Sequence, residues 1–174
     1  MISNIIFEGP DMCGKTHIAR ALASILHIPY FKNAREREVF GSEDTRYFAT
    51  ASQYVDTYMV SFLRDTQTHV IFDRNYPSQF VYPRVFGRDH DLDLLRRIDD
   101  AHAELGTRIV IPVRSTYHDL HDDVHDCIIP TTLELLDAGY RDFVEWTKCR
   151  TLLLNVDDED IDRELADILA WLSS

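Results

Sequence analysis

Eight consecutive residues near the N-terminus could bind the phosphates of a polyphosphate ligand. The segment Gly9-Pro10-Asp11-Met12-Cys13-Gly14-Lys15-Thr16 fits the pattern G-x-x-x-x-G-K-[ST]. In such a loop backbone N–H groups surround phosphate oxygens, the lysine reaches the terminal phosphates and the hydroxyl ligates Mg²⁺. The apolar run before it suits a strand and the segment after it suits a helix, which is the context that this mechanism needs. The residues predicted to bind the ligand are Gly9, Asp11, Met12, Cys13, Gly14, Lys15 and Thr16, with Thr16 also on the metal.

Charged side chains follow the other apolar runs of the chain. Lys32 follows the second run, Asp73 and Arg74 end the third, and Arg114 follows the fourth. Parallel sheets bind ligands beyond the carboxyl ends of their strands. We therefore expect these groups to lie together with the segment at 9–16, called the phosphate loop below, at one edge of the sheet. Each of them could instead be a solvated strand end.

The elements that position these residues alternate along the chain. The pattern predicts strands at 2–8, 28–32, 69–73, 108–113 and 152–156, and helices at 14–26, 46–66, 78–86, 90–105, 130–147 and about 161–172. This alternation is typical of the α/β class, here a five-stranded parallel sheet with helices on both faces in three layers. Two helices show expected core stripes, which are Ile18, Leu22, Ile25 and Leu26 on the first and Phe48, Ala51, Val55, Met59 and Phe62 on the longer one.

Length and composition favour one globular domain spanning residues 1–174. The formal net charge of −12 argues against a broad nucleic-acid surface but is compatible with a small phosphorylated ligand held by a local cationic cluster. No apolar run is long enough for a membrane span, so a soluble cytoplasmic protein is expected. Cys127 and Cys149, like Cys13, have no metal-type spacing and are expected to be reduced thiols.

Two segments resemble known kinases. Residues 8–16 look like the opening of the thymidylate kinases and of their relatives, the deoxynucleoside kinases. The segment Asp73-Arg74-Asn75-Tyr76-Pro77-Ser78-Gln79-Phe80-Val81-Tyr82 looks like the Asp-Arg signature of thymidylate kinases, which is followed by an aromatic residue, a Ser and a Tyr at similar spacing. Together the two segments indicate a P-loop kinase of nucleosides or nucleotides.

The resemblance implies roles for individual residues. Lys15 and Thr16 would hold ATP–Mg²⁺, Asp73 would support the metal or the acceptor, and Arg74 would bind the acceptor near its 5′ end. Gln53, on the helix at 46–66, would read a pyrimidine edge, although it could instead be a solvated helix residue. The expected substrate-binding residues are Lys32, Arg37, Gln53, Arg74 and Tyr82.

The chain departs from the thymidylate kinases in its supply of arginine. Those enzymes take a catalytic Arg from the phosphate loop or from a lid after the fourth strand, but here Met12 occupies the loop position and the lid-like segment at about 115–129 contains none. Arg114 is the expected substitute, with Arg141 and Arg150 as alternatives, so the expected catalytic residues are Lys15, Asp73, Arg74 and Arg114. The lid-like segment carries His118, His121 and His125, which could bind a transition metal or belong to a solvated lid.

Three functions remain open from the sequence. A deoxynucleoside monophosphate kinase ranks first, because Lys32, Arg35 and Arg37 suit an acceptor that already carries phosphate. The second is a deoxynucleoside kinase, or a kinase of a hydroxymethylated pyrimidine, free or in DNA. The third is a nucleotide-dependent switch without an acceptor, against which the Asp73-Arg74 segment speaks. The sequence leaves the oligomeric state open, a homodimer included.

Overall fold

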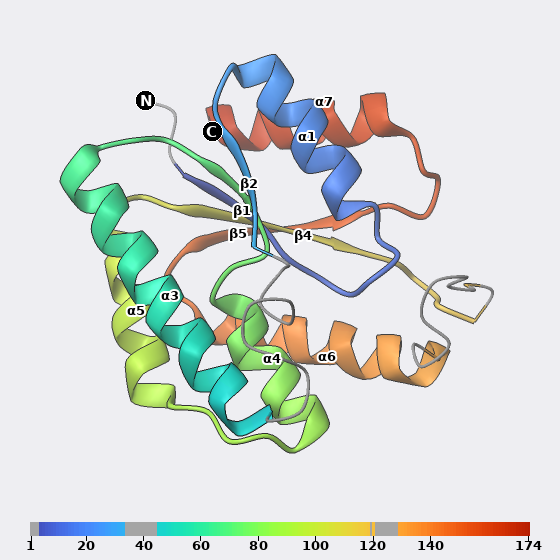
Figure 1. Cartoon of the computed structure of the whole chain (residues 1–174). Helices are drawn as coiled ribbons and strands as arrows, with labels where there is room; N and C mark the ends of the chain where they lie inside the picture. Colours follow the sequence, from blue (N-terminus) through green and yellow to red (C-terminus); the bar gives the residue numbers. More distant parts are fainter. Residues whose placement is uncertain (1–3, 34–44, 119, 121–128) are drawn as a thin grey trace.

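The sheet has five parallel strands in the order β2-β3-β1-β4-β5. The computed structural model describes residues 4–33, 45–118, 120 and 129–174, with side chains of the long helix described from residue 52 onward. The strands are β1 (Ile5–Phe7), β2 (Tyr30–Lys32), β3 (Ile71–Asp73), β4 (Arg108–Val113) and β5 (Arg150–Asn155). The α/β class and the five-stranded parallel sheet expected from the sequence are confirmed (Figure 1).

Strand register brings the predicted polar residues to one edge of the sheet. Phe7, the last residue of β1, pairs with Asp73, the last residue of β3. Asp73 in turn pairs with Lys32, the last residue of β2. The phosphate loop that follows β1 therefore starts level with the ends of both neighbouring strands.

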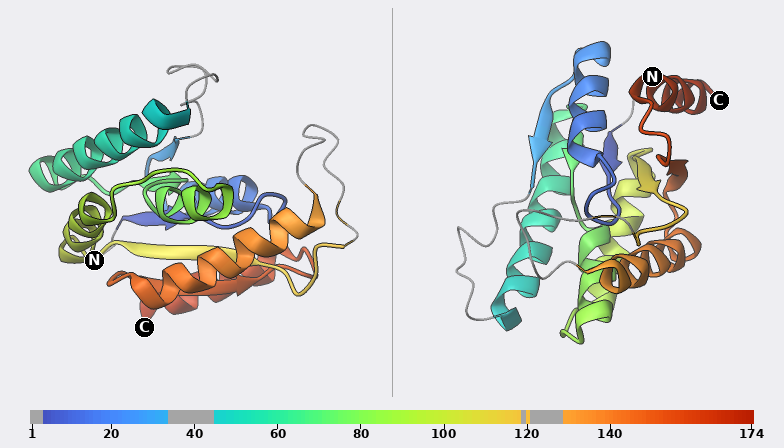
Figure 2. Two further views of the ribbon diagram at one scale, coloured as in Figure 1. Left: turned by 90° about the horizontal axis from the view of Figure 1, so that it is seen from below. Right: turned by 90° about the vertical axis from the view of Figure 1, so that its right-hand side faces the viewer.

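Helices cover both faces of the sheet. On one face lie α1 (Lys15–Leu26) and α7 (Ile161–Ser173), and on the other lie α3 (Thr45–Thr66), α4 (Pro77–Phe86), α5 (Leu92–Glu104) and α6 (Pro130–Trp146) (Figures 1 and 2). Successive residues of a strand point to opposite faces. Ile5 and Phe7 accordingly pack in the cluster under α1 and α7, whereas Ile6 packs in the cluster under the other four helices. No helix in the described part of the chain combines the length and the apolar character that crossing a membrane requires.

The structure corrects two of the expected core stripes. Burial on α1 stops at Ala23, and Ile25 on the last turn is 48% exposed. On α3, Phe62 is 41% exposed, whereas the polar residues Ser52, Gln53 and Asp56 are buried. The reason is that α3 reaches the apolar cluster of the sheet through Met59 and Leu63, in its C-terminal half, and turns a polar face inward nearer its N-terminus.

Candidate active site

The phosphate loop is folded by backbone conformations that favour glycine. Gly9 has φ +137°, and a Cβ there would lie 2.8 Å from the carbonyl oxygen of Pro112 on β4, so no side chain fits. Met12 and Gly14 both adopt positive φ, at 65° and 67°. The loop thus passes close to β4 and delivers the chain to the first turn of α1, whose free N–H groups form an anion-binding N-terminus.

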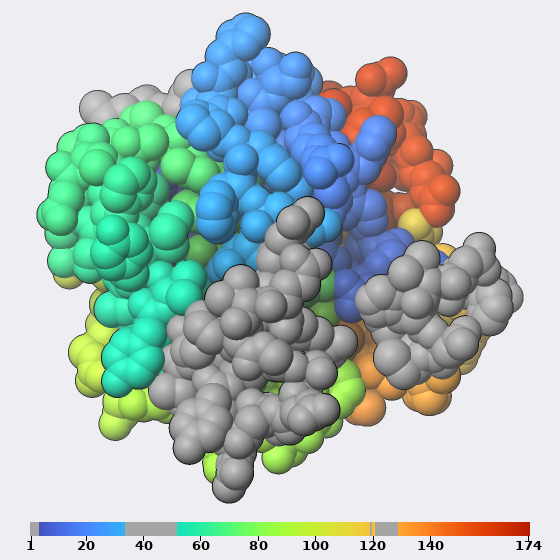
Figure 3. Space-filling model, in the orientation of Figure 1, coloured from blue at the N-terminus to red at the C-terminus, as the bar shows by residue number. Residues whose placement is uncertain are grey.

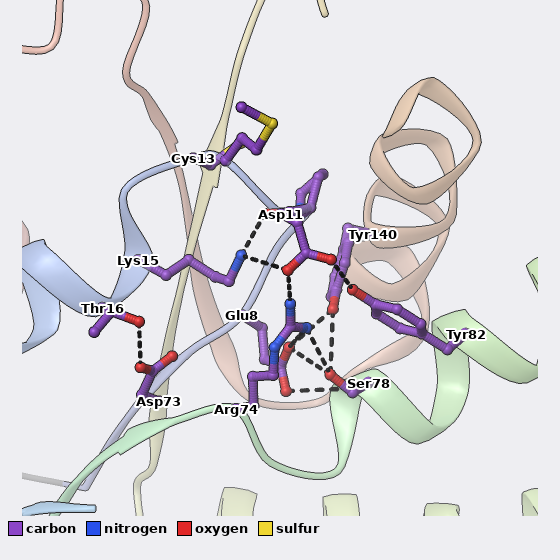
Figure 4. Close-up of polar contacts among 12 residues, drawn as sticks. Glu8, Asp11, Cys13, Lys15, Thr16, Asp73, Arg74, Ser78, Tyr82 and Tyr140 are labelled. Atoms are coloured by element: carbon purple, nitrogen blue, oxygen red, sulfur yellow. Dashed lines mark hydrogen bonds and ion pairs between the residues drawn. The ribbon is translucent and has the colours of Figure 1, made fainter. Parts of the chain in front are cut away.

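Lys15 is folded back onto the phosphate loop. Its ammonium group donates to the carbonyl oxygen of Pro10 and lies 3.8 Å from Asp11 Oδ1 (Figure 4). The side chain is only 7% exposed. Burial, together with the nearby Arg74, lowers the pKa of Lys15 to about 8. A bound polyphosphate would reverse this effect, because opposite charge favours the protonated form.

Asp73, at the end of β3, links β2 to the start of α1. Its Oδ2 accepts hydrogen bonds from the Thr16 hydroxyl at 2.6 Å and from the Tyr30 hydroxyl at 2.7 Å. Lys32 Nζ lies 3.8 Å from the same oxygen and donates to Thr16 Oγ1 at 3.3 Å. The carboxylate and hydroxyl oxygens of Asp73 and Thr16 are the hard ligands that Mg²⁺ takes in one- or two-carboxylate sites completed by phosphate and water. The donor set beside the phosphate loop therefore fits the ion.

Arg74 is held in a strained conformation beside the loop. Its φ is 71°, a region uncommon for a non-glycine residue, and its N–H donates to the carbonyl oxygen of Phe7 at 2.9 Å. The guanidinium donates to Asp11 Oδ1, lies 3.8 Å from Glu8 Oε2 and sits over the Tyr82 ring at 5.3 Å (Figure 4). The Tyr82 hydroxyl donates to Asp11 Oδ2 at 3.1 Å. Residues far apart in the sequence thus form one charged cluster.

Glu8 is the buried centre of this cluster. It is 0% exposed and accepts hydrogen bonds from the Asn75 N–H at 2.6 Å, the Ser78 hydroxyl at 2.8 Å and the Tyr140 hydroxyl at 2.8 Å. Burial raises the pKa of Glu8, and Arg74 and these donors oppose the rise. The sequence pattern assigned Glu8 no role of its own, although a charged residue at the end of an apolar strand was a usable signal.

Arg114 lies on the other side of the loop, next to a cavity. Its Nε donates to the carbonyl oxygen of Met12 at 3.4 Å, and its Nη2 lies 2.6 Å from Glu159 Oε1. The cavity measures about 370 Å³ and adjoins the phosphate loop. Its walls are Met12, Cys13, Gly14, His17, Ile18, Arg114, Val156, Glu159, Ile161 and Glu164.

Gln53 is enclosed instead of solvated. It is 2% exposed, and its Nε2 has no hydrogen-bond partner within the described ranges. The alternative of a solvated helix residue is therefore wrong. Figure 3 shows the surface of β2 in light blue between α3 and α1. Asn33, directly after β2, donates to Asp56 Oδ1 on α3 at 3.3 Å, so the end of β2 contacts the helix that carries Gln53.

Most of the predicted site residues come together, and one alternative, Arg150, does not. The phosphate loop, Lys32, Asp73, Arg74, Tyr82 and Arg114 meet at the carboxyl edge of the sheet. Arg150 begins β5 and donates to Ser174, at the opposite edge, so it cannot supply charge to the loop. Arg141 is paired with Asp137 on α6 at 2.7 Å. Arg37, Phe48, His121, His125 and Cys127 lie outside the described residues or side chains, and among those described no group of three metal-binding residues occurs.

Comparison with known proteins relates the chain to others through its fold. No known family profile matches the sequence, and no curated protein sequence matches it either. Among solved structures, the thymidylate kinase of Ehrlichia chaffeensis superimposes with a TM-score of 0.67 at 16% identity, over 98% of both chains. The M. mycoides deoxyadenosine kinase with bound dATP gives 0.65 at 17% identity, over 98% of this chain and all of the other.

A third solved structure is similar over the whole chain. The YorR protein of Bacillus subtilis, in complex with phosphorylated GDP, gives a TM-score of 0.61 at 22% identity, over 98% of this chain and 96% of the other. Both kinase groups that the two sequence segments resemble are therefore represented among the structures with this architecture. The chain has the fold of the P-loop nucleotide and nucleoside kinases.

Proposed function

We propose that this protein transfers the γ-phosphoryl group of ATP to a deoxynucleoside monophosphate. One observation carries the proposal: the phosphate loop lies in contact with cationic side chains from two neighbouring strand ends, Lys32 of β2 and Arg74 after β3. Phosphoryl transfer asks the protein mainly for positioning and charge stabilisation. A loop for the donor with cations beside it for the acceptor meets both needs.

The donor would lie along the loop. Its phosphates would receive hydrogen bonds from the loop N–H groups, from the α1 N-terminus and from Lys15, which would give up its contact with Pro10. The base and ribose would occupy the cavity of about 370 Å³ beside Met12, His17 and Arg114. Arg114 would supply the cation that the loop lacks at Met12, since it already contacts the Met12 carbonyl oxygen.

Thr16 and Asp73 would hold Mg²⁺ through their oxygens, which lie 2.6 Å apart. When bound, the ion would neutralise charge on the β- and γ-phosphates. Lys32 and Tyr30 already fix the Asp73 carboxylate, so this ligand would need little reorganisation.

The acceptor would bind on the α3 and α4 side of the loop. Arg74 and Lys32 would contact its phosphate, with Arg37 as a further predicted contact. Tyr82 would restrict where the acceptor binds, and Gln53 would contact its base. An oxygen of the acceptor phosphate attacks the γ-phosphorus, the bond from that phosphorus to the bridging oxygen of ADP breaks, and a nucleoside diphosphate and ADP result. The cations at the strand ends favour an acceptor that is already phosphorylated over one that offers a hydroxyl group.

A deoxynucleoside kinase is the second candidate. The buried Gln53 amide favours it, because the resemblance to deoxynucleoside kinases includes a Gln in this region. The deoxyadenosine kinase fold is also nearly as similar as that of the thymidylate kinase, at TM-scores of 0.65 and 0.67. In that case the attacking oxygen would be the 5′-hydroxyl, and a group at the site would have to take its proton.

One assay separates these candidates. The protein is incubated with ATP labelled in the γ-phosphate and Mg²⁺, together with each deoxynucleoside, each deoxynucleoside monophosphate or a hydroxymethylated pyrimidine in free or DNA form. Labelled diphosphate product from a monophosphate supports the proposal. Labelled nucleoside monophosphate supports a deoxynucleoside kinase, and a labelled hydroxymethylated pyrimidine, free or in DNA, supports a kinase of that group. Label transfer to no acceptor contradicts all of these kinase functions.

A further inference from the structure

Tyr117 sits where the chain leaves β4 towards the lid-like segment, and it is buried at 3% exposure. Its hydroxyl contacts three separate parts of the chain. It accepts from the backbone N–H of Arg114 at 3.3 Å, donates to Asp137 Oδ1 on α6 at 3.0 Å and lies 3.9 Å from Cys13 Sγ in the phosphate loop. One oxygen atom therefore links the loop, the exit of β4 and α6.

The protonation states of these groups are consistent with that set of contacts. Burial raises the pKa of Tyr117, and the neighbouring Cys13 and Asp137 add to the rise. Burial likewise raises the pKa of the Cys13 thiol. A neutral phenol donates one hydrogen bond and accepts two. Tyr117 can thus donate to the Asp137 carboxylate while accepting from the Arg114 N–H and from the protonated thiol of Cys13.

Tyr117 contacts two residues of the site, Cys13 and Arg114, and both lie next to the Met12 carbonyl group. Cys13 follows Met12 in the loop, and Arg114 donates to the Met12 carbonyl oxygen at 3.4 Å. The other end of the link is fixed, because Arg141 Nε lies 2.7 Å from Asp137 Oδ2 on α6. The Tyr117 hydroxyl thus ties the backbone of Arg114 to the loop on one side and to α6 on the other.

We infer that Tyr117 is a positioning residue that holds Arg114 and the phosphate loop in register for phosphoryl transfer. This inference rests on the proposed function, in which Arg114 supplies the charge that Met12 does not. Tyr117 acts through Arg114 and Cys13 and touches neither substrate. Removing the Tyr117 hydroxyl should displace the Arg114 cation. A displaced cation affects charge stabilisation in the transition state more than nucleotide binding, so kcat should fall and ATP affinity should stay nearly unchanged.

The test is Tyr117→Phe, which keeps the ring and removes the hydroxyl. We expect kcat to fall about 10- to 100-fold, with the ATP dissociation constant changed less than about threefold. The matched control is Tyr76→Phe, because the Tyr76 hydroxyl is equally buried and also donates to a carboxylate, Asp99, but within the core. It should lower the unfolding midpoint and leave kcat within about twofold of wild type. A Tyr117→Phe enzyme with wild-type kcat overturns the inference.

A double-mutant cycle tests the route of the effect. In an Arg114→Ala background, Tyr117→Phe should cause little further loss of kcat, and an undiminished loss would contradict action through Arg114. Should Tyr117→Phe not fold, Asp137→Asn weakens the same link and should lower kcat in the same way.

The alkylation rate of Cys13, followed by peptide mass analysis, gives a readout independent of catalysis. Tyr117→Phe should raise this rate severalfold over both wild type and Tyr76→Phe, because the loop loses its anchor, and an unchanged rate counts against the link. Failure of wild type to phosphorylate any acceptor would refute the proposed function, while the thiol rates would still report on the link itself.

Discussion

At the scale of single residues, the site consists of buried charged groups that shift one another's pKa values. Arg74 lies between Asp11 and the fully buried Glu8, and it adopts a positive φ to do so. Backbone strain of this kind costs on the order of 1–3 kcal/mol and persists only where the surroundings enforce it. The contacts of Arg74 with two carboxylates and with the Tyr82 ring supply that enforcement.

The first prediction concerns the stability of an Arg74→Ala variant. The folded pKa of Glu8 is raised, so Glu8 favours the folded state below its unfolded pKa near 4.5, and this contribution is lost as pH rises through the folded pKa. Without Arg74 the pKa of Glu8 rises further. The unfolding free energy, measured by urea titration, should therefore drop by more at pH 8 than at pH 5. Arg74→Lys keeps a charge and should show a smaller pH dependence, whereas an equal loss at both pH values would contradict the account.

The second prediction concerns the proton on Lys15. Since burial and Arg74 lower its pKa to about 8, roughly half of the free protein carries a neutral Lys15 at that pH. Binding of ATP raises this pKa, so the complex takes up a proton. Calorimetric titration at pH 8 in buffers of different ionisation enthalpy should show uptake of about half a proton. A Lys15→Met variant should lose that uptake, and uptake equal to wild type would assign it to another group.

At the scale of elements, the loop between β1 and α1 depends on Gly9. The third prediction is that Gly9→Ala destabilises the protein strongly, because the new Cβ would meet the carbonyl oxygen of Pro112 at 2.8 Å in addition to the cost of its φ. Gly106 is the matched control, since it also has positive φ, at 67°, but its Cβ would meet nothing within 4 Å. Gly106→Ala should cost only about 1–2 kcal/mol, the usual left-handed penalty. Equal unfolding free energies for the two variants would contradict the close approach of the phosphate loop to β4.

The fourth prediction concerns the polar inner face of α3. Gln53 presents a buried amide donor that lacks a partner within the described residues, so a base edge that fills this position gains a hydrogen bond. Gln53→Ala should lower kcat/KM for the preferred base, which corresponds to a loss of about 1–3 kcal/mol of transition-state stabilisation, and it should reduce discrimination between bases. Tyr54→Ala is the control, because Tyr54 lies on the same helix but is 67% exposed. Unchanged base preference in the Gln53 variant would remove Gln53 from substrate recognition.

At the scale of the whole molecule, the sequence predicted those features that depend on local patterns. The five parallel strands follow from apolar runs, and the meeting of Lys32, Asp73 and the phosphate loop follows from the rule that parallel strands share one carboxyl edge. The inward polar face of α3 was missed, because helical periodicity shows which residues share a face but not which face packs inward.

The contacts that sequence reasoning could not reach join residues far apart in the chain. Glu8 meets Tyr140 across 132 positions, and Cys13 meets Tyr117 across 104. Nothing in the local pattern around any of these residues indicates its partner. The choice among the candidate catalytic arginines also depended on three-dimensional placement. Arg150 lies at the opposite edge of the sheet, whereas Arg114 contacts the Met12 carbonyl oxygen.

The most direct test of the central claim compares acceptor-dependent phosphoryl transfer by wild type and Lys15→Met. The fold of the variant is checked by circular dichroism and its unfolding midpoint, and the rate is measured with γ-labelled ATP, Mg²⁺ and the best monophosphate acceptor. We expect the variant to stay folded and to lose more than about 100-fold in rate, because the buried lysine lies in the phosphate loop and would neutralise charge on the transferred group. A folded variant with a rate within about tenfold of wild type would show that the phosphate loop does not carry the reaction.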